Sequence, residues 1–204
     1  MRPMPRKGDQ GDTPMLFQPL VESSDIPAIP GLRYFPEYIS KSEEAELVMA
    51  IDAAPWDTTW DRRRQPYGAT YGDKPTVELP IPEWGQSMSE RIFKEGLTER
   101  PFNQMLVNEY LPGQGIAMHR DYEPFDRTVV SLSLLSPCVM DFRRGRTGPQ
   151  KSLLLEPRSL LLLSDEARYE WEHGIARRKV DPWHGLRIPR GRRLSITFRA
   201  KKLT

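Results

Sequence analysis

The second half of the chain consists of short runs in which hydrophobic positions alternate or cluster between polar ones. Six such runs occupy residues 103–111, 127–135, 138–144, 151–157, 158–164 and 192–200. They are β-branched or leucine-rich and are separated by Pro, Gly or Ser, which is typical of β-strands. The leucine runs taken alone fit a helix as well. Together the runs predict a β-sandwich or jelly roll.

Two amphipathic helices are predicted ahead of these strands. Ser40 and Glu43 match a capping box and are followed by hydrophobic residues at helical spacing, so a helix is expected over about 42–53. A second is expected over 82–97, with Pro82 in its first turn. Its apolar side would be made of Trp84, Met88, Ile92 and Phe93. The predicted fold class is α+β, mainly β: a double-stranded β-helix (jelly roll) with the N-terminal helices packed on one sheet.

Length and composition predict one folded domain. The chain has 204 residues, of which 38% are hydrophobic, and this suffices for a single core. Residues 1–25, rich in Pro, Gly and charge, are expected to be a disordered arm, and residues 26–204 to form the domain, with its core at 101–204. Residues 56–80 are too long for an ordinary connection, so a functional loop or a short hairpin is expected there.

The composition also bears on location and partners. No apolar run approaches the roughly 20 residues of a membrane span, and no hydrophobic signal region follows the basic start, so a cytoplasmic monomer without membrane contact is expected. Cys138 has no partner for a disulfide. The net charge is only +2, but residues 175–204 hold ten Lys or Arg and one acid. This bias indicates a phosphate-rich partner, although solvated basic surface produces the same pattern.

Histidine is scarce, and two of the three histidines fall where a metal would need them. His119 and Asp121 are two residues apart, so on a strand they share a face. With His173 from a distant strand they supply two nitrogens and one oxygen, the facial triad of non-heme Fe(II) oxygenases. Singly, each histidine is more often structural, and His184 is interpreted as a loop residue.

Two further strands are predicted to direct polar side chains into one pocket. Within 103–111, Asn108 and Tyr110 share a face. Within 192–200, hydrophobic residues fill one face and the other consists of Arg193, Ser195, Thr197 and Arg199. Arginine pairs with carboxylates through two parallel hydrogen bonds, so this strand predicts an anion clamp beside the metal. Two surface arginines on an edge strand are the alternative.

These residues resemble the AlkB family of Fe(II)- and 2-oxoglutarate-dependent dioxygenases. The resemblance is strong over roughly residues 100–200 and looser upstream. It is carried by residues 106–110, Pro112-Gly113, His119-x-Asp121, residues 130–134, His173-Gly174-Ile175 and Arg193-x5-Arg199. The segment Glu166-Ala167-Arg168-Tyr169, with Trp171, is similar to bacterial members and to the animal branch that modifies tRNA.

The resemblance implies the roles of the pocket residues. Fe(II) would be ligated by His119, Asp121 and His173. The co-substrate 2-oxoglutarate would be held by Asn108, Tyr110, Arg193, Ser195 and Arg199, with Arg193 on the far carboxylate and Arg199 near the keto-acid end. Ser195 stands where the best-known bacterial member has Asn. The implied reaction uses O₂ to couple decarboxylation of 2-oxoglutarate to hydroxylation of an alkyl C–H bond. If that carbon is attached to a base nitrogen, the hydroxylated product collapses and the base is restored without its alkyl group.

The resemblance further implies a nucleotide-recognition lid at 56–80. Arg62, Arg64 and Tyr67 suit phosphate contact and base stacking, and Glu123 lies near where family members read the base edge. The implied partner is DNA or RNA carrying alkylated bases, and the implied function is repair. A solvated loop and a packed tyrosine are the alternatives for these residues. An oxygenase acting on a tRNA wobble base, a protein or a lipid would share every pocket residue, whereas a catalytically silent binding protein would not need them intact.

Overall fold

The computed structural model describes residues 21–69 and 79–201, and strands predominate in these ranges. The helical elements are η1 (Ser23–Asp25), α1 (Lys41–Ala53), α2 (Glu83–Lys94) and α3 (Asp165–Tyr169). The strands are β1 (Leu32–Phe35), β2 (Arg64–Gly68), β3 (Gln104–Tyr110), β4 (Ile116–His119), β5 (Phe125–Leu134), β6 (Cys138–Arg144), β7 (Gln150–Leu155), β8 (Leu160–Leu163), β9 (Trp171–Ile175), β10 (Val180–Trp183), β11 (Leu186–Pro189) and β12 (Arg193–Lys201).

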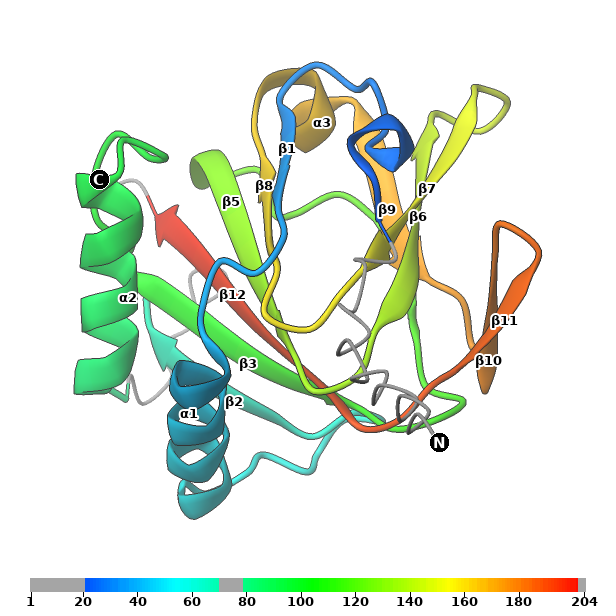
Figure 1. Cartoon of the computed structure of the whole chain (residues 1–204). Helices are drawn as coiled ribbons and strands as arrows, with labels where there is room; N and C mark the ends of the chain where they lie inside the picture. Colours follow the sequence, from blue (N-terminus) through cyan, green and yellow to red (C-terminus); the bar gives the residue numbers. More distant parts are fainter. Residues whose placement is uncertain (1–20, 70–78, 202–204) are drawn as a thin grey trace, which may run out of the picture.

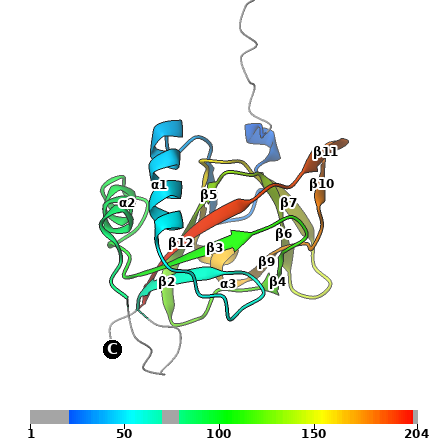
Figure 2. The same cartoon turned by 90° about the horizontal axis from the view of Figure 1, so that it is seen from below.

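The strands form two facing antiparallel sheets, which confirms the predicted jelly roll. The larger sheet has the order β1-β8-β5-β12-β3-β2, and the smaller has the order β4-β9-β6-β7. Strands β10 and β11 form a separate hairpin. Seen from below in Figure 2, α1 and α2 cover the outer face of the larger sheet, and the smaller sheet lies on its other side. The fold therefore has three layers, and a space for a ligand is available between the sheets.

Helix α1 begins with the predicted capping box. The Ser40 backbone N–H donates to the Glu43 carboxylate at 2.7 Å, and the Ser40 hydroxyl accepts from the Glu43 N–H at 3.2 Å. These reciprocal bonds satisfy two otherwise unpaired donors of the first turn. Leu47 and Ile51 are the buried residues of the helix, so its apolar side faces the sheet.

Helix α2 is predicted correctly in position, and its predicted apolar side is confirmed for Trp84, Met88 and Ile92 but not for Phe93. It spans Glu83–Lys94 with Pro82 as its N-cap, and it buries Met88 and Ile92. Phe93, expected on the same side, is 41% exposed, because it is one residue further around the helix than Ile92. A side-chain carbon added at Gly85 would lie 2.7 Å from the sulfur of Met105, so this glycine permits close packing of α2 on the sheet.

Strand β12 carries both the core and the pocket. Leu194, Ile196 and Phe198 are fully buried in the hydrophobic cluster under α1 and α2. The intervening residues point to the opposite face, toward the smaller sheet. Pairing with β3 sets Arg193 opposite Tyr110 and Ser195 opposite Asn108, so these four side chains share one face. The alternation predicted for both strands is confirmed.

The predicted end of the N-terminal arm at residue 25 is too late. Val21 is 5% exposed and belongs to the hydrophobic cluster that also contains Ile29 and Tyr34. Residues 23–25 form η1, and Asp25 lies 3.0 Å from the Nε2 of His184 in the β10–β11 turn. Residues 1–20 lie outside the described ranges. Among the described helices, none has the length and apolar character needed to cross a membrane.

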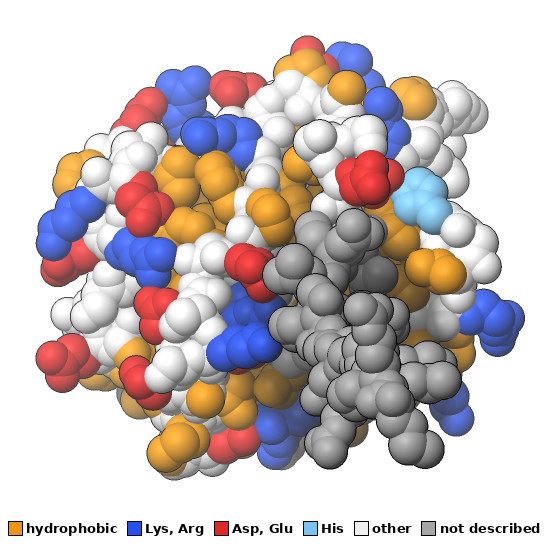
Figure 3. All heavy atoms as spheres, viewed as in Figure 1, with side chains coloured by type: hydrophobic (Ala, Val, Ile, Leu, Met, Phe, Trp, Pro, Cys, Tyr) orange, Lys and Arg blue, Asp and Glu red, His pale blue; other side chains and the backbone are white. Residues whose placement is uncertain are grey.

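The molecular face drawn in Figure 3 carries side chains of both charges close together. Among the described residues, Arg158 forms ion pairs with Glu37 and Glu44, both at 3.2 Å, and Arg91 pairs with Glu43 at 2.9 Å. Figure 3 shows hydrophobic side chains between the charged ones, and the neighbouring cations and anions are in line with the small net charge.

Candidate active site

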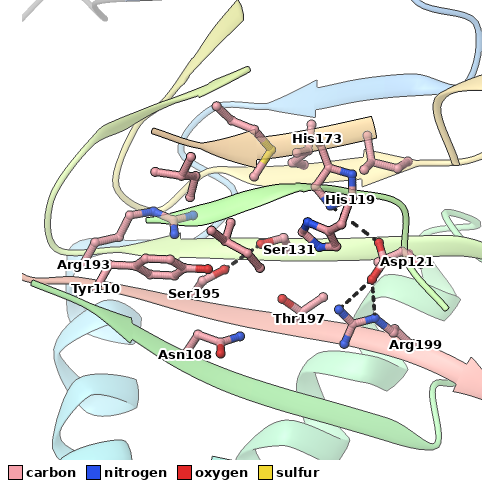
Figure 4. A pocket seen from close by; sticks show the side chains of 16 residues that line it. Asn108, Tyr110, His119, Asp121, Ser131, His173, Arg193, Ser195, Thr197 and Arg199 are labelled. Carbon is pink, nitrogen blue, oxygen red and sulfur yellow. Dashed lines mark hydrogen bonds and ion pairs between the residues drawn. The ribbon is translucent and has the colours of Figure 1, made fainter. Parts of the chain in front are cut away.

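A pocket lies between the two sheets, and it collects the polar residues predicted for the site (Figure 4). Its volume is about 60 Å³. One water needs about 10–15 Å³ of such space, so the pocket has room for a small organic molecule. Its polar lining consists of Asn108, Tyr110, His119, Asp121, Ser131, His173, Arg193, Ser195, Thr197 and Arg199. Apolar side chains such as Met140 and Leu161 complete the walls.

The two predicted histidine ligands come from neighbouring strands. His119 on β4 is paired with His173 on β9, and their ring centroids are 4.6 Å apart. The two-residue spacing had suggested that His119 and Asp121 lie on one strand. Strand β4 ends at His119, however, so Asp121 enters the pocket from the loop that follows. Its Oδ2 nevertheless lies 3.7 Å from the Nε2 of His173. The structure thus brings all three residues together.

The Nδ1 contact of His119 and the neutral form of His173 suit metal binding. The Nδ1 of His119 lies 2.8 Å from the carbonyl oxygen of Ala117, which leaves Nε2 for a ligand. His173 is 9% exposed, and burial lowers its pKa to about 4 although Asp121 opposes the shift. His173 is therefore neutral at pH 7, the form in which imidazole coordinates a metal.

Asp121 is held as a carboxylate by a neighbouring cation. Burial favours a raised pKa, but the charge of Arg199, with His173 and a hydrogen bond from Arg199, outweighs it and keeps the pKa of Asp121 well below its usual range. Two donors bound cis to one metal at about 2.1 Å lie about 3 Å apart, so the 3.7 Å between Asp121 and His173 is close to that spacing. Within residues 21–69 and 79–201, no group of three or more His, Cys, Asp or Glu side chains is already arranged tightly enough to hold a metal ion. The fit to Fe(II) rests on this set of two neutral imidazoles and one carboxylate.

Arg193 forms an anion site at the other end of the pocket. It is 2% exposed, and its Nη2 donates to the Ser133 hydroxyl at 2.8 Å. Its Nε and Nη1 are buried without a hydrogen-bond partner. Leaving a buried cation with two free donors is costly unless an anion binds there. A carboxylate of a small dianion matches this pair of donors.

The remaining pocket residues lie where the strand pattern predicted. Asn108 is 8% exposed. Burial raises the pKa of Tyr110, so its phenol is neutral and can donate a hydrogen bond. The hydroxyl of Ser195 lies 2.9 Å from that of Ser131, so the short side chain has a partner on β5.

The lid residues divide between the two faces of the larger sheet. Arg64 is paired with Asn108 across β2 and β3 and therefore shares the pocket face. Tyr67 is paired with Met105 on the opposite face, packs against the cluster under the helices, and donates its hydroxyl to Gln65 at 3.3 Å. The prediction that Tyr67 stacks on a base is therefore wrong, because its ring packs against the hydrophobic cluster on the face away from the pocket. Residues 70–78 of the predicted lid lie outside the described ranges.

Glu123 and Arg62 occupy different environments. Glu123 is exposed in the turn after Asp121 and is not among the residues that line the pocket. Its predicted role on the base edge stays a prediction. Arg62 donates to the carbonyl of Gly115 at 2.9 Å, and its guanidinium lies 5.2 Å from the centre of the Tyr110 ring. It therefore lies against a pocket residue and not over open solvent.

Two residues beside the site, Trp60 and Arg168, were not predicted as site residues from the sequence. Trp60 is 60% exposed and stacks on the guanidinium of Arg64 at 4.4 Å. Arg168 is 2% exposed and donates to the carbonyls of Asp121 and Tyr122 at 2.9 and 2.7 Å. The only sequence signal for Arg168 was its place in the quoted segment ahead of His173. No local pattern showed that its guanidinium would hold the loop that carries Asp121.

The jelly roll, the two-histidine, one-carboxylate set and the arginine beside it define the class of non-heme iron oxygenases. Comparison with known families agrees: residues 46–199 match the model of the 2OG-Fe(II) oxygenase superfamily. The chain belongs to this superfamily and, by its relatives, to the AlkB family within it. It is a 2-oxoglutarate-dependent dioxygenase, and its cofactors are Fe(II), 2-oxoglutarate and O₂.

Three relatives place the chain within the family. The uncharacterized protein L905 of Acanthamoeba polyphaga mimivirus is 32% identical and covers 83% of this chain and 84% of its own length. The alkylated DNA repair protein ALKBH8 homolog of Arabidopsis thaliana is 37% identical, over 84% of this chain and 58% of its own. The probable RNA/DNA demethylase ALKBH6 of Danio rerio is 32% identical, over 72% and 70%. The chain thus spans little more than half of the Arabidopsis protein.

A solved structure agrees in fold. The structure of OsALKBH1 superposes with a TM-score of 0.62 over 84% of this chain and 98% of that chain, at 17% sequence identity. The arrangement of sheets and covering helices is therefore that of an AlkB-type jelly roll.

Proposed function

We propose that this dioxygenase removes alkyl groups from nucleic-acid bases by oxidation. The observation that carries the proposal is the Trp60–Arg64 stack on the pocket face of β2. An exposed indole with a guanidinium on it combines a stacking surface for a base with a charge for a phosphate. Arg64 lies opposite the pocket residue Asn108, so a strand bound there could present a base to the pocket.

The pocket residues are assigned as follows. His119, Asp121 and His173 would hold Fe(II), and Arg193 would pair with the far carboxylate of 2-oxoglutarate. When bound, the metal and co-substrate supply the oxidising power for hydroxylation of the alkyl carbon. The protein contributes orientation and a dry, shaped cavity, because Arg193 and the phenol of Tyr110 are buried. Asn108, Ser195 and Arg199 would bind the rest of the keto acid.

The relatives support a nucleic-acid substrate without identifying it. The fish relative is a probable RNA/DNA demethylase, and a Caenorhabditis elegans relative, 28% identical over 84% of this chain, is a DNA N6-methyl adenine demethylase. Hydroxylation at a carbon bound to a base nitrogen would give a product that collapses and restores the base. Removal of such adducts would place the enzyme in repair of alkylated DNA or RNA.

A second candidate is hydroxylation of a tRNA wobble base. It is favoured by relatives named tRNA (carboxymethyluridine(34)-5-O)-methyltransferase ALKBH8, such as that of Mus musculus, which is 36% identical over 74% of this chain. The match covers only 25% of that protein, so most of the mouse sequence has no counterpart in this chain. The same pocket residues would serve this reaction.

One assay distinguishes the candidates. The protein is incubated with Fe(II), ascorbate and 2-oxoglutarate and with methyl or etheno adducts in single- and double-stranded DNA and RNA, or with unmodified and wobble-modified tRNA. Loss of the adduct with matching succinate is expected. Asp121→Ala serves as the control that lacks a metal ligand. Succinate formation without any change in the adducted nucleosides would contradict the dealkylase function, and a hydroxylated wobble nucleoside would favour the second candidate.

A further inference from the structure

Two arginines from different parts of the chain lie over the same tyrosine ring. The guanidinium carbon of Arg193 on β12 is 5.3 Å from the centre of the Tyr110 ring, and that of Arg62, in the loop before β2, is 5.2 Å from it. Arg193 and Tyr110 line the pocket. Arg62 was grouped from the sequence with Arg64 as a phosphate contact, but the two arginines face different surroundings.

The guanidinium of Arg62 is held by the protein next to the pocket residue Tyr110. Its Nη1 donates to the carbonyl of Gly115 at 2.9 Å, and its Nε is buried with no hydrogen-bond partner. The guanidinium of Arg64 lies over the exposed Trp60, and its Nε binds Asp57 at 2.9 Å. Of the two, only Arg64 is placed against a surface that a nucleic acid could cover.

The loop that carries Arg62 is fastened to the turn ahead of β4. The side-chain amide of Gln114 donates to the backbone carbonyl of Asp61 at 2.7 Å, and the Asp61 carboxylate pairs with Arg177 at 2.6 Å. With the bond from Arg62 to Gly115, three polar contacts hold this loop over the end of the pocket where Tyr110 lies. The position of Arg62 is therefore set by the fold.

The charge at this end of the pocket is uncompensated by carboxylates. Among the described residues, no Asp or Glu oxygen lies within ion-pair distance of Arg62 or Arg193; Arg62 donates to a backbone carbonyl and Arg193 to a hydroxyl. Burial raises the pKa of Tyr110, and among the charges that oppose this shift Arg62 contributes more than Arg193. Two cations around one buried phenol attract an anion more strongly than either alone, since attraction at low dielectric reaches several ångströms.

We propose that Arg62 acts on the co-substrate: it is a positioning residue that holds Tyr110 and adds the second positive charge for the distal carboxylate of 2-oxoglutarate. This inference rests on the proposed placement of that carboxylate at Arg193. Two nearby residues of the lid would then contact different ligands: Arg64 would contact the nucleic acid, and Arg62 would act on 2-oxoglutarate.

The test compares ligand affinities of variants of the full-length protein, with Mn(II) in place of Fe(II) to prevent turnover. Arg62→Gln should weaken 2-oxoglutarate binding roughly tenfold, as expected for loss of one interaction with a charged group, and leave the affinity for a single-stranded oligonucleotide within about twofold. Arg62→Lys, which keeps the charge but loses the planar fork, should fall between. Arg64→Gln is the matched control and should show the reverse: weaker oligonucleotide binding and unaltered 2-oxoglutarate affinity.

A second readout separates a local effect from a general loss of structure. The analogue 2-oxopentanoate lacks the distal carboxylate, so the preference for 2-oxoglutarate over it should fall roughly tenfold in Arg62→Gln. An unchanged preference, or weaker oligonucleotide binding by Arg62→Gln, would overturn the proposal. If Arg62→Gln does not fold, Arg62→Lys carries the same comparison. Because the titrations need no substrate base, a protein that binds 2-oxoglutarate as expected but dealkylates nothing would overturn the proposed function alone.

Discussion

Arg199 binds a single oxygen of Asp121 through two nitrogens. Its Nη2 and Nε lie 2.7 and 2.8 Å from Oδ1, whereas the other oxygen, Oδ2, lies 3.7 Å from the Nε2 of His173 (Figure 4). Both residues are buried, at 6% and 7% exposure. One carboxylate therefore connects the arginine strand to the histidine strand, with one oxygen committed to each side of the pocket.

Arg199→Gln is expected to weaken metal binding and turnover together. The substitution removes the cation that keeps Asp121 ionised and oriented, and partners of metal ligands typically contribute about 10- to 100-fold to metal affinity or activity. Affinity is measured by titration with Mn(II), and turnover by succinate formation. The exposed Arg127, which pairs with Glu99 and Asp165, provides the control Arg127→Gln, with no expected change in either measurement. Unaltered Mn(II) affinity in Arg199→Gln would contradict this role.

Arg193→Met should separate stability from function. The substitution removes a buried cation with two unpartnered donors, so the free energy of unfolding without ligand is expected to be unchanged or higher by on the order of 1 kcal/mol. The wild type should gain about 2.7 kcal/mol at 2-oxoglutarate concentrations 100 times Kd, and the variant should gain almost nothing. Thermal unfolding with and without 2-oxoglutarate measures both quantities. A variant that is less stable by several kcal/mol but still stabilised by the ligand would refute the anion site.

His119→Ala tests the metal site with little risk to folding. The side chain is half-buried, and its Nδ1 contacts the carbonyl of Ala117 two residues away. The free energy of unfolding of the metal-free protein should change by no more than about 0.5–1 kcal/mol. Succinate formation should fall below detection, because one of the three proposed metal ligands is lost. Near-normal turnover in this variant would mean that the histidine is structural.

Site features that depend on local sequence could be predicted, and those that depend on contacts between distant residues could not. The pocket faces of β3 and β12 could be predicted, because alternation within one strand is local and the hydrophobic residues mark the opposite face. The side of Tyr67 could not, because β2 has no hydrophobic alternation and its face depends on pairing with β3. The contact between Arg168 and the carbonyl of Asp121 joins residues 47 apart and has no pattern in either segment.

Trp60→Ala should weaken nucleic-acid binding without affecting the keto acid. Stacking of one base on an aromatic ring contributes about 1–3 kcal/mol, so the affinity for a single-stranded oligonucleotide should fall by roughly five- to 150-fold. Fluorescence anisotropy of a labelled oligonucleotide measures the loss. Trp56 stacks with Arg63, whose guanidinium is bound to Glu109 on the other face of the sheet, so Trp56→Ala is the matched control. Equal losses in both variants would argue against a specific platform at Trp60.

A buried cluster away from the pocket should dominate the acid sensitivity of the fold. The fully buried Asp181 receives hydrogen bonds from Arg190 at 2.5 and 2.7 Å, from Arg178 at 2.6 Å and from the Val139 N–H at 3.1 Å. Burial alone would raise the pKa of Asp181, but these donors outweigh it and hold the pKa below the usual 3.8. The carboxylate thus adds stability above about pH 4, and this contribution is lost as the pH falls through the folded-state pKa.

Asp181→Asn is therefore expected to cost about 3–5 kcal/mol in the free energy of unfolding at pH 7, because it leaves Arg190 buried without its counter-charge. The difference from wild type should begin to shrink below about pH 4, where the unfolded wild-type chain takes up the proton, and should disappear as the pH falls through the lowered folded-state pKa of Asp181. Denaturant unfolding at pH 7 and at pH 3.5 measures both values. Asp126→Asn breaks a more exposed ion pair with Arg100 and should cost no more than about 1 kcal/mol. Similar losses in the two variants would show that the buried cluster has no special weight, since burial is what makes an unpaired guanidinium costly.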